Sequence, residues 1–182
     1  AMKLLRTIES NSPIEFQITE IQCGGQHYLE TGVEWPEGSF EYCRDESDAI
    51  LLGAIGWPSA TMPNGDLAGG QVILGLRSGL DLYANVRPIK LYEGIQHKIH
   101  GGFKQVWSPG LVDMVVVREN TEGFYADRSM AAGSGEFMPT EDVALAVRKI
   151  TRDASRRIAE VACRIAATRS GRLAVVHKAN VL

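Results

Sequence analysis

Hydrophobic positions recur with two different periods in the first part of the chain, and each period predicts a type of element. Residues 2–9 place leucine and isoleucine on one face at helical spacing, so we expect a helix that ends before Pro13. Residues 14–21 alternate apolar and polar side chains, which is the pattern of a half-buried strand. The apolar run 49–52, which is followed by a glycine, is typical of a fully buried strand in a parallel sheet.

The middle of the chain is expected to contain a loop, a helix and an extended segment. Residues 56–70 are punctuated by glycine and proline and form a loop too long to be an idle connector. Residues 72–83 have apolar side chains at helical spacing, and a helix there would pair Arg77 with Asp81 across one turn. The chain then becomes extended, because Pro88 lacks an N–H group and pushes the preceding residue out of the helical region.

The last third of the chain predicts a strand, a long helix and a short strand. The β-branched residues of 112–117 favour the first strand, and Thr140 is expected to cap a helix that closes at Gly171. Residues 173–176 then form a short buried strand. The core-facing stripe of the helix is expected to consist of Val143, Val147, Ile150, Ala154, Ile158, Val161 and Ile165.

Strands that alternate with helices indicate an α/β fold, with a parallel or mixed sheet flanked by helices. Residues 126–139 contain glycines and few large apolar groups, which suggests a mobile or partner-dependent arm. The chain opens within a helical pattern and ends on the apolar pair Val181 and Leu182, so we expect it to be incomplete at both ends.

The composition narrows the class of protein without pointing to a function. Of the 182 residues, 45% are hydrophobic and 23% are charged, and the net charge is −3. The lysines and arginines are scattered, so we expect no nucleic-acid partner. The three cysteines stand at wide spacing, and no apolar run approaches the roughly 18 residues that span a bilayer. We therefore expect reduced thiols, no membrane association and a cytoplasmic location.

Polar side chains stand where two of the expected strands end. The strand at 112–117 is followed by Arg118 and, after a polar loop, by Tyr125. Ligand sites of α/β sheets lie beyond the carboxyl ends of strands, so this arginine is a candidate for the site. Lys178 follows the second strand, and a lysine in a water-poor cleft can act as a base. Taken alone, each of these side chains could equally be an ordinary surface group.

Arg77 and Arg87 provide two further guanidinium groups. Two or three of them converging on one ligand would bind a small di- or tricarboxylate, whereas neutralisation by Asp81 or by solvent is the alternative. The four histidines have no spacing typical of a metal site, so a solvated loop explains His97 and His100 better. The run GAIG at 53–56 lacks the spacing of a dinucleotide-binding or phosphate-binding loop.

These motifs together resemble the isopropylmalate/isocitrate dehydrogenase family, the metal-dependent decarboxylating dehydrogenases that include homoisocitrate, tartrate and D-malate types. The resemblance covers essentially the whole chain, in the order that the family has. The similar segments are LGAIGWP at 52–58, LR at 76–77, DLYANVRP at 81–88, VRENTEGFY at 117–125 and KANVL at 178–182.

The resemblance implies roles in catalysis and substrate binding. Arg77, Arg87 and Arg118 would bind the carboxylates of a malate-like substrate. Tyr125 would be the acid that protonates the enol left after loss of carbon dioxide. Lys178 would remove the hydroxyl proton or assist in this, and in such enzymes it reaches the active site of the other subunit. The implied reaction is NAD(P)-dependent oxidative decarboxylation of a 3-substituted malate, of tartrate or of D-malate.

The resemblance also implies cofactors and a partner. Trp57, Pro58 and Asn180 would lie near the nicotinamide nucleotide, which is NAD or NADP. The second cofactor would be Mg²⁺ or Mn²⁺, with ligands expected outside this chain. The arm at about 126–139 would clasp a second subunit, which implies a homodimer.

The chain departs from the family in length and in one helix. The N-terminal strand of the family and its downstream aspartates are absent, so the chain would be roughly half of a subunit. Residues 1–84 would form part of the large domain, and 85–182 the small domain. Ile73 and Leu74 suit an apolar substituent or a small substrate and do not suit a third carboxylate. A non-catalytic paralogue or regulatory subunit is the alternative, although the retained charged residues favour an enzyme.

Overall fold

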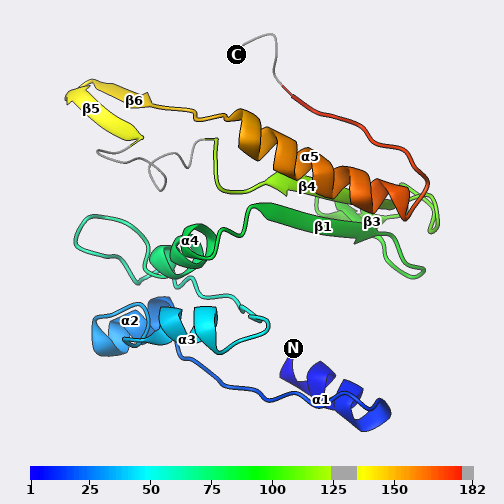
Figure 1. The fold of residues 1–182 in the computed structure, drawn as a ribbon, viewed down its shortest axis with the longest axis horizontal. Helices are drawn as coiled ribbons and strands as arrows, with labels where there is room; N and C mark the ends of the chain where they lie inside the picture. Colours follow the sequence, from blue (N-terminus) through cyan, green and yellow to red (C-terminus); the bar gives the residue numbers. More distant parts are fainter. Residues whose placement is uncertain (124–134, 178–182) are drawn as a thin grey trace. The chain divides into compact units, whose positions relative to one another are not determined.

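The computed structural model describes residues 1–123 and 135–177. The chain divides into two compact units, the N-terminal unit Ala1–Ile73 and the C-terminal unit Leu74–Leu182. Its described elements are, in order, α1 (Met2–Asn11), α2 (Gly25–Thr31), α3 (Ser39–Asp45), α4 (Gly70–Gly79), β1 (Ala84–Lys90), β2 (His97–Ile99), β3 (Gly102–Lys104), β4 (Asp113–Glu119), β5 (Glu136–Thr140), β6 (Val143–Ala146) and α5 (Arg152–Ala167) (Figure 1). The mixed α/β character is confirmed, whereas the domain boundary between residues 84 and 85 stays a prediction.

The N-terminal unit is built around a close approach of two backbone segments. The N–H of Gly25 donates a hydrogen bond of 2.7 Å to the carbonyl of Ile55. A methyl group on Gly25 would lie only 2.6 Å from Cβ of Trp57, so no side chain fits there. The buried Glu34 accepts a 2.6 Å hydrogen bond from the N–H of Gly69 through Oε1. The glycine turn and Glu34 therefore fix both ends of the loop that contains Trp57.

Helix α1 agrees with the sequence pattern, because it ends at Asn11 and Ser12 adopts extended backbone. The predicted strands at 14–21, 49–52 and 173–176 are wrong, since none of these segments pairs with another strand among the described residues. Their apolar side chains stay exposed, for example Leu51 at 64% and Val176 at 97%. An apolar or alternating run becomes a strand only when a second backbone offers hydrogen bonds to it.

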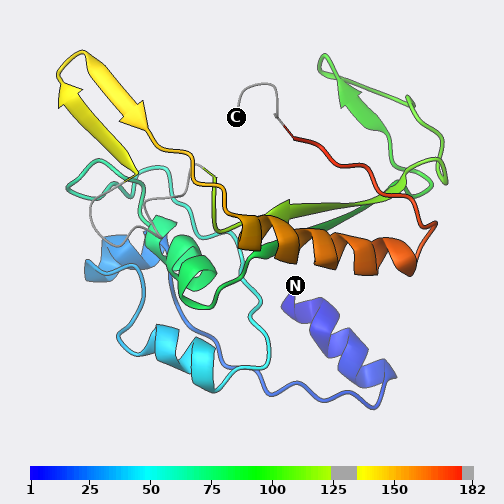
Figure 2. The ribbon, with the colours of Figure 1, turned by 45° about the horizontal axis from the view of Figure 1, so that its top comes forward.

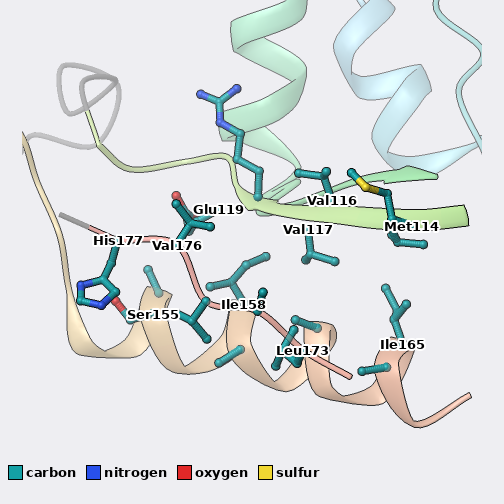
Figure 3. Close-up of a pocket in the computed structure, with 18 of the residues that line it drawn as sticks. Met114, Val116, Val117, Glu119, Ser155, Ile158, Ile165, Leu173, Val176 and His177 are labelled. Atoms are coloured by element: carbon teal, nitrogen blue, oxygen red, sulfur yellow. The ribbon is translucent and has the colours of Figure 1, made fainter. Parts of the chain in front are cut away.

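The C-terminal unit contains an antiparallel pair of strands with a helix against one face. β1 pairs with β4 from Ala84 opposite Glu119 to Lys90 opposite Asp113. α5 runs along this pair in both views (Figures 1 and 2). Val117 points from β4 toward Ile158 of α5, whereas Val116 points away and is 41% exposed (Figure 3). One face of the β1–β4 pair is therefore packed, and the other is open.

The predicted parallel sheet is not present in the described part of the chain. Its three sheets are two-stranded, and all of them are antiparallel. A parallel pair needs a crossover, usually through a helix, before the second strand. Between β1 and β4 the chain instead forms the β2–β3 hairpin and returns, so the two strands run in opposite directions.

The long helix begins at Arg152, so its predicted start at Thr140 is wrong. Val143–Ala146 is strand β6, which pairs with β5. The cap is Thr151, whose hydroxyl oxygen accepts a 3.2 Å hydrogen bond from the N–H of Ala154. From Ala154 onward the predicted apolar stripe does lie on α5. Gly171 follows its end with φ +71°, and its N–H bonds to the carbonyl of Ala166 at 3.0 Å.

Two further predictions concern ends of elements. The helical pair between Arg77 and Asp81 is wrong, because α4 ends at Gly79 and Asp81 adopts φ +47° beyond it. The arm predicted at 126–139 falls largely outside the described residues, and its described end belongs to β5. Within the described ranges, no helix has both the length and the apolar character needed to cross a membrane.

Candidate active site

Two of the predicted substrate ligands lie on the open face of the β1–β4 pair. Residues directly opposite each other in an antiparallel pair project to the same face, and so do residues two apart on one strand. Arg118 is opposite Asn85, and Arg87 is opposite Val116, which points away from α5 (Figure 3). Arg87, Asn85 and Arg118 therefore share one face, and diagonal neighbours of this kind have Cα atoms about 7–8 Å apart.

Asn85 contacts the guanidinium group of Arg87. Nε of Arg87 donates a 2.9 Å hydrogen bond to Oδ1 of Asn85. Nδ2 of Asn85 in turn donates a 3.3 Å bond to Oδ1 of Asn120. Asn120 is only 7% exposed, and it bonds to the backbone carbonyls of Tyr83 at 2.9 Å and Leu82 at 3.2 Å. A buried amide thus links the segment before β1 to the loop after β4.

The carboxylate of Glu119, the last residue of β4, accepts hydrogen bonds from the loop that follows it. Glu119 accepts hydrogen bonds from the N–H groups of Thr121 at 3.0 Å and Glu122 at 2.7 Å. The hydroxyl of Thr121 donates a third bond of 2.6 Å to Glu119. This arrangement supplies partners to backbone groups that leave the strand, and it gives the polar run after Arg118 a defined shape.

Arg157 of α5 holds this loop from the packed side. It donates to Asp81 at 2.7 Å and to the hydroxyl of Thr121 at 2.9 Å, and it lies 3.7 Å from a carboxylate oxygen of Glu119. Its guanidinium carbon stands 4.3 Å from the ring centre of Tyr83. Burial disfavours the charged form, but the acidic neighbours Asp81 and Glu119 raise the pKa of Arg157. The loop, the turn before β1 and α5 therefore meet at one cation.

A second set of hydrogen bonds joins the end of the loop to the residues that precede α5. The carboxylate of Glu122 accepts bonds from the N–H of Thr151 at 2.8 Å and from its hydroxyl at 2.7 Å. The backbones of Gly123 and Lys149 exchange two hydrogen bonds of 2.9 and 3.0 Å. The loop is thus tied to the residues that cap the helix.

The other predicted site residues lie elsewhere or outside the described chain. Arg77 is in the last turn of α4 and is half-buried, and its carbonyl accepts a 2.8 Å bond from the N–H of Leu82. Trp57, 48% exposed, and the exposed Pro58 belong to the loop of the N-terminal unit. The predicted residues outside the described ranges are Tyr125, Lys178 and Asn180.

A groove of about 1730 Å³ lies on the side of β4 that faces α5. Its walls are mostly apolar side chains of β4, α5 and residues 172–177, including Val117, Ile158 and Leu173 (Figure 3). Arg118 is also among the residues that line this groove, whereas Arg87 is not. Only the open face therefore carries both arginines for a small anionic ligand.

Among residues 1–123 and 135–177, no group of three or more His, Cys, Asp or Glu side chains is arranged to hold a metal ion. The placement of metal ligands outside the chain therefore stays a prediction.

Sequence reasoning did not identify Asn85, Asn120 or Arg157. One signal for Asn85 was available, because it stands two residues before Arg87 in an extended segment and must share its face. The contacts of Arg157 with Asp81 and Thr121 join residues far apart in the sequence, and no local pattern reveals them.

Comparison with known proteins gives a single family. The family of isocitrate/isopropylmalate dehydrogenases matches residues 1–182. The chain is 35% identical to a 3-isopropylmalate dehydrogenase of Clostridium acetobutylicum, and 36% identical to one of Corynebacterium efficiens. In both comparisons all of this chain is covered, together with 49% and 48% of the relative, so the chain spans about half the length of these proteins.

Solved structures point to the same family. A β-decarboxylating dehydrogenase of Thermococcus kodakarensis matches with a TM-score of 0.59 and 30% identity, over 98% of this chain and 44% of that one. An isocitrate dehydrogenase of Methylococcus capsulatus matches with a TM-score of 0.54 and 29% identity, over 87% and 41% respectively. The chain, whose open strand face carries the arginines of two motifs, belongs to the isocitrate/isopropylmalate dehydrogenase family.

Proposed function

We propose that the protein catalyses the NAD-dependent oxidative decarboxylation of a 3-substituted malate or a related 2-hydroxyacid. The observation that carries this proposal is the placement of Arg87 and Arg118 on one open strand face. Two guanidinium groups on diagonal positions of one strand face can each receive one carboxylate of a malate-like substrate in a forked pair of hydrogen bonds. The names of the relatives agree with this reaction class.

Side chains of this chain account for the proton transfers. Lys178 takes the hydroxyl proton, and NAD, when bound, would accept a hydride from the same carbon, which would give a 2-keto acid. The bond from the neighbouring carbon to its carboxylate then breaks, carbon dioxide leaves, and the electron pair forms the double bond of an enolate. Tyr125 donates a proton to that carbon. Arg87 and Arg118 keep the substrate oriented throughout, which reduces the entropic part of the barrier.

NAD and a divalent cation, Mg²⁺ or Mn²⁺, are the cofactors we propose, with Trp57, Pro58 and Asn180 near the nicotinamide. The described residues contain no carboxylate set that fits the cation.

The favoured substrate has an apolar substituent. Ile73 and Leu74 lie on α4, the helix that also carries Arg77. Their side chains match an alkyl group, whereas a third carboxylate would be desolvated beside them without a partner. We therefore rank an isopropylmalate-type substrate above D-malate and tartrate, and all three above isocitrate.

The test is a turnover assay on the full-length protein with Mn²⁺ and NAD or NADP. Reduced nucleotide and carbon dioxide should form in equal amounts with at least one of isopropylmalate, D-malate and tartrate. Arg118→Lys should lower kcat/KM by about 10- to 100-fold, because an ammonium cannot replace a forked pair of charged hydrogen bonds. Arg44→Lys, which changes an exposed arginine of α3, is the matched control and should keep wild-type kinetics. If none of the substrates is bound or turned over, the proposed enzymatic function is excluded and a non-catalytic paralogue is favoured.

We further propose a cytoplasmic homodimer in which Lys178 serves the site of the partner subunit. The supporting evidence is the resemblance of residues 178–182 to the family motif. Lys178→Met and Tyr125→Phe should each abolish turnover. After the two inactive variants are mixed and allowed to exchange subunits, some mixed dimers contain one intact site, so activity should reappear. If Lys178 acts within its own subunit, no mixed dimer has an intact site and the mixture stays inactive.

A further inference from the structure

We propose that Asn85 is a positioning residue that fixes the guanidinium group of Arg87 for a carboxylate ligand, and that Asn120 fixes Asn85. The inference rests on the proposed function, because it assigns the arrangement a role in binding a dicarboxylate. Two consecutive hydrogen bonds support it. Nε of Arg87 donates to Oδ1 of Asn85 at 2.9 Å, and Nδ2 of Asn85 donates to Oδ1 of Asn120 at 3.3 Å.

Asn85 binds Nε of Arg87, and this nitrogen is not needed for a forked pair of bonds to the terminal edge of the guanidinium group. A guanidinium group has a terminal edge, formed by its two Nη atoms, that receives a carboxylate in a forked pair of bonds. Fixing Nε stops rotation about the last bonds of a long side chain and leaves this edge in a defined direction. Arginine loses about 2 kcal/mol of rotamer entropy when it is fixed, so fixing it before binding favours affinity.

Asn85 carries no charge, and this suits its position beside two arginines. Asn85 is directly opposite Arg118 and two residues before Arg87, so it stands between the two cations. An amide oxygen accepts a hydrogen bond from Arg87 without cancelling its charge. A carboxylate at this place would hold Arg87 equally well, but it would compete with the substrate for both arginines.

Asn120 determines which way the amide of Asn85 points. Its own orientation is defined, because its Nδ2 donates to the carbonyl of Leu82 and its backbone N–H donates to that of Tyr83. Oδ1 of Asn120 must then accept from Asn85, which turns Oδ1 of Asn85 toward Arg87. With 7% of its surface exposed, Asn120 has little competition from water. The motif after β4 thereby sets the geometry of the motif in β1.

The experiment compares Asn85→Ala, Asn85→Asp and Asn120→Ala with the wild-type full-length protein, and Asn11→Ala serves as control. Asn11 also bonds through its amide, to the carbonyl of Thr7 at 2.7 Å, but it belongs to α1. Asn85→Ala and Asn120→Ala should raise KM for the dicarboxylate about three- to tenfold and change kcat less. Asn85→Asp should raise KM more, and the increase should shrink at high salt. A purely structural role would lower the active fraction and leave KM unchanged.

A second readout does not depend on activity. In nitrogen-labelled protein, Arg87→Lys identifies the Nε–H resonance of Arg87, whose exchange with water should be slow in the wild type and in Asn85→Asp. The exchange should become fast in Asn85→Ala. Unchanged exchange in Asn85→Ala would overturn the positioning role, and so would an unchanged KM. If exchange responds as expected but no substrate is turned over, the proposed function fails and the contact itself stands.

Discussion

Arg157 contacts several of the segments that surround the candidate site. It reaches the turn before β1, the loop after β4 and the ring of Tyr83 from one position on α5. Its Nε is buried and has no hydrogen-bond partner among the described residues. Removal of its side chain would leave Glu119 and Thr121 partly desolvated and without their cation.

We therefore expect Arg157→Ala to lower the free energy of unfolding by about 1–2 kcal/mol, a value reduced because Asp81 is largely exposed. Arg156→Ala is the matched control on the same helix. Its side chain is 69% exposed and pairs only with Asp153 and Glu160 on the helix surface among the described residues, so the change should be below about 0.5 kcal/mol. Urea unfolding measures both, and equal losses would contradict the role of Arg157.

The sequence motifs named Arg87 and Arg118 as candidate substrate ligands, which stays a prediction, and they did not reveal which residues hold Arg87 and the loop after Arg118 in place. Arg87 and Arg118 were found from their motifs, and the register of β1 with β4 puts them on one face. The supports Asn85, Asn120 and Arg157 depend on pairings between distant residues. Such pairings leave no periodic trace in the sequence.

The start of α5 is the element boundary with the best-defined chemistry. Thr151 caps the helix through its hydroxyl, and the same hydroxyl donates to Glu122 of the loop. Cap and loop are therefore coupled. The sequence alone favoured Thr140, which is followed by two acidic residues, but that threonine lies in β5.

Thr151→Ala should lower the free energy of unfolding by about 1–2 kcal/mol, since it removes an N-cap and a hydrogen bond to a carboxylate. Thr140→Ala, the cap that the pattern predicted, should change it by less than about 0.5 kcal/mol. Chemical unfolding followed by circular dichroism distinguishes the two. The reverse order of effects would place the start of the helix at Thr140.

Helices and strands were predicted correctly where neighbouring residues in the sequence determine them. The helix α1, the extended β1, the strand β4 and the second half of α5 follow from spacing and from single breakers such as Pro88. The strands at 14–21, 49–52 and 173–176 were wrong because a strand also requires a partner, which a sequence pattern does not supply. Val143–Ala146 was mistaken for helix because Val143 and Val147 fit helical spacing as well as strand alternation.

At the scale of the whole molecule, acid stability depends on carboxylates paired with arginines. Among the described residues, hydrogen bonds from arginine lower the pKa of three carboxyl groups, Glu9 beside Arg6, Asp45 beside Arg44 and Asp113 beside Arg169. Arg44 and Asp45 are adjacent in the sequence, so their pairing can persist in the unfolded chain. Glu9 also accepts a hydrogen bond from the N–H of Phe16, 2.9 Å, and its partner Arg6 stands one helical turn away. Asp113 and Arg169 are far apart in the sequence and are brought together by folding.

Because the pKa of Asp113 is lower in the folded state, its contribution to stability is complete above the unfolded pKa of about 3.9 and is lost as pH falls toward the lower folded value. Asp113→Asn should therefore flatten the loss of stability with acid in this range. Asp45→Asn should leave the slope unchanged. Unfolding curves taken at pH values from neutral to acid measure the slopes, and equal slopes for wild type and Asp113→Asn would contradict the assignment.

The antiparallel register of β1 and β4 has a consequence for how this protein can vary or be engineered. The arginine pair depends on which residues face each other across the two strands, and not on the length of chain between them. Residues 91–112 connect β1 to β4, and the entropic cost of closing such a connection grows only slowly with its length. Insertions or deletions there should be tolerated during divergence. The tip of the β2–β3 hairpin is thus a suitable place to graft a tag or a reporter without moving Arg87 relative to Arg118.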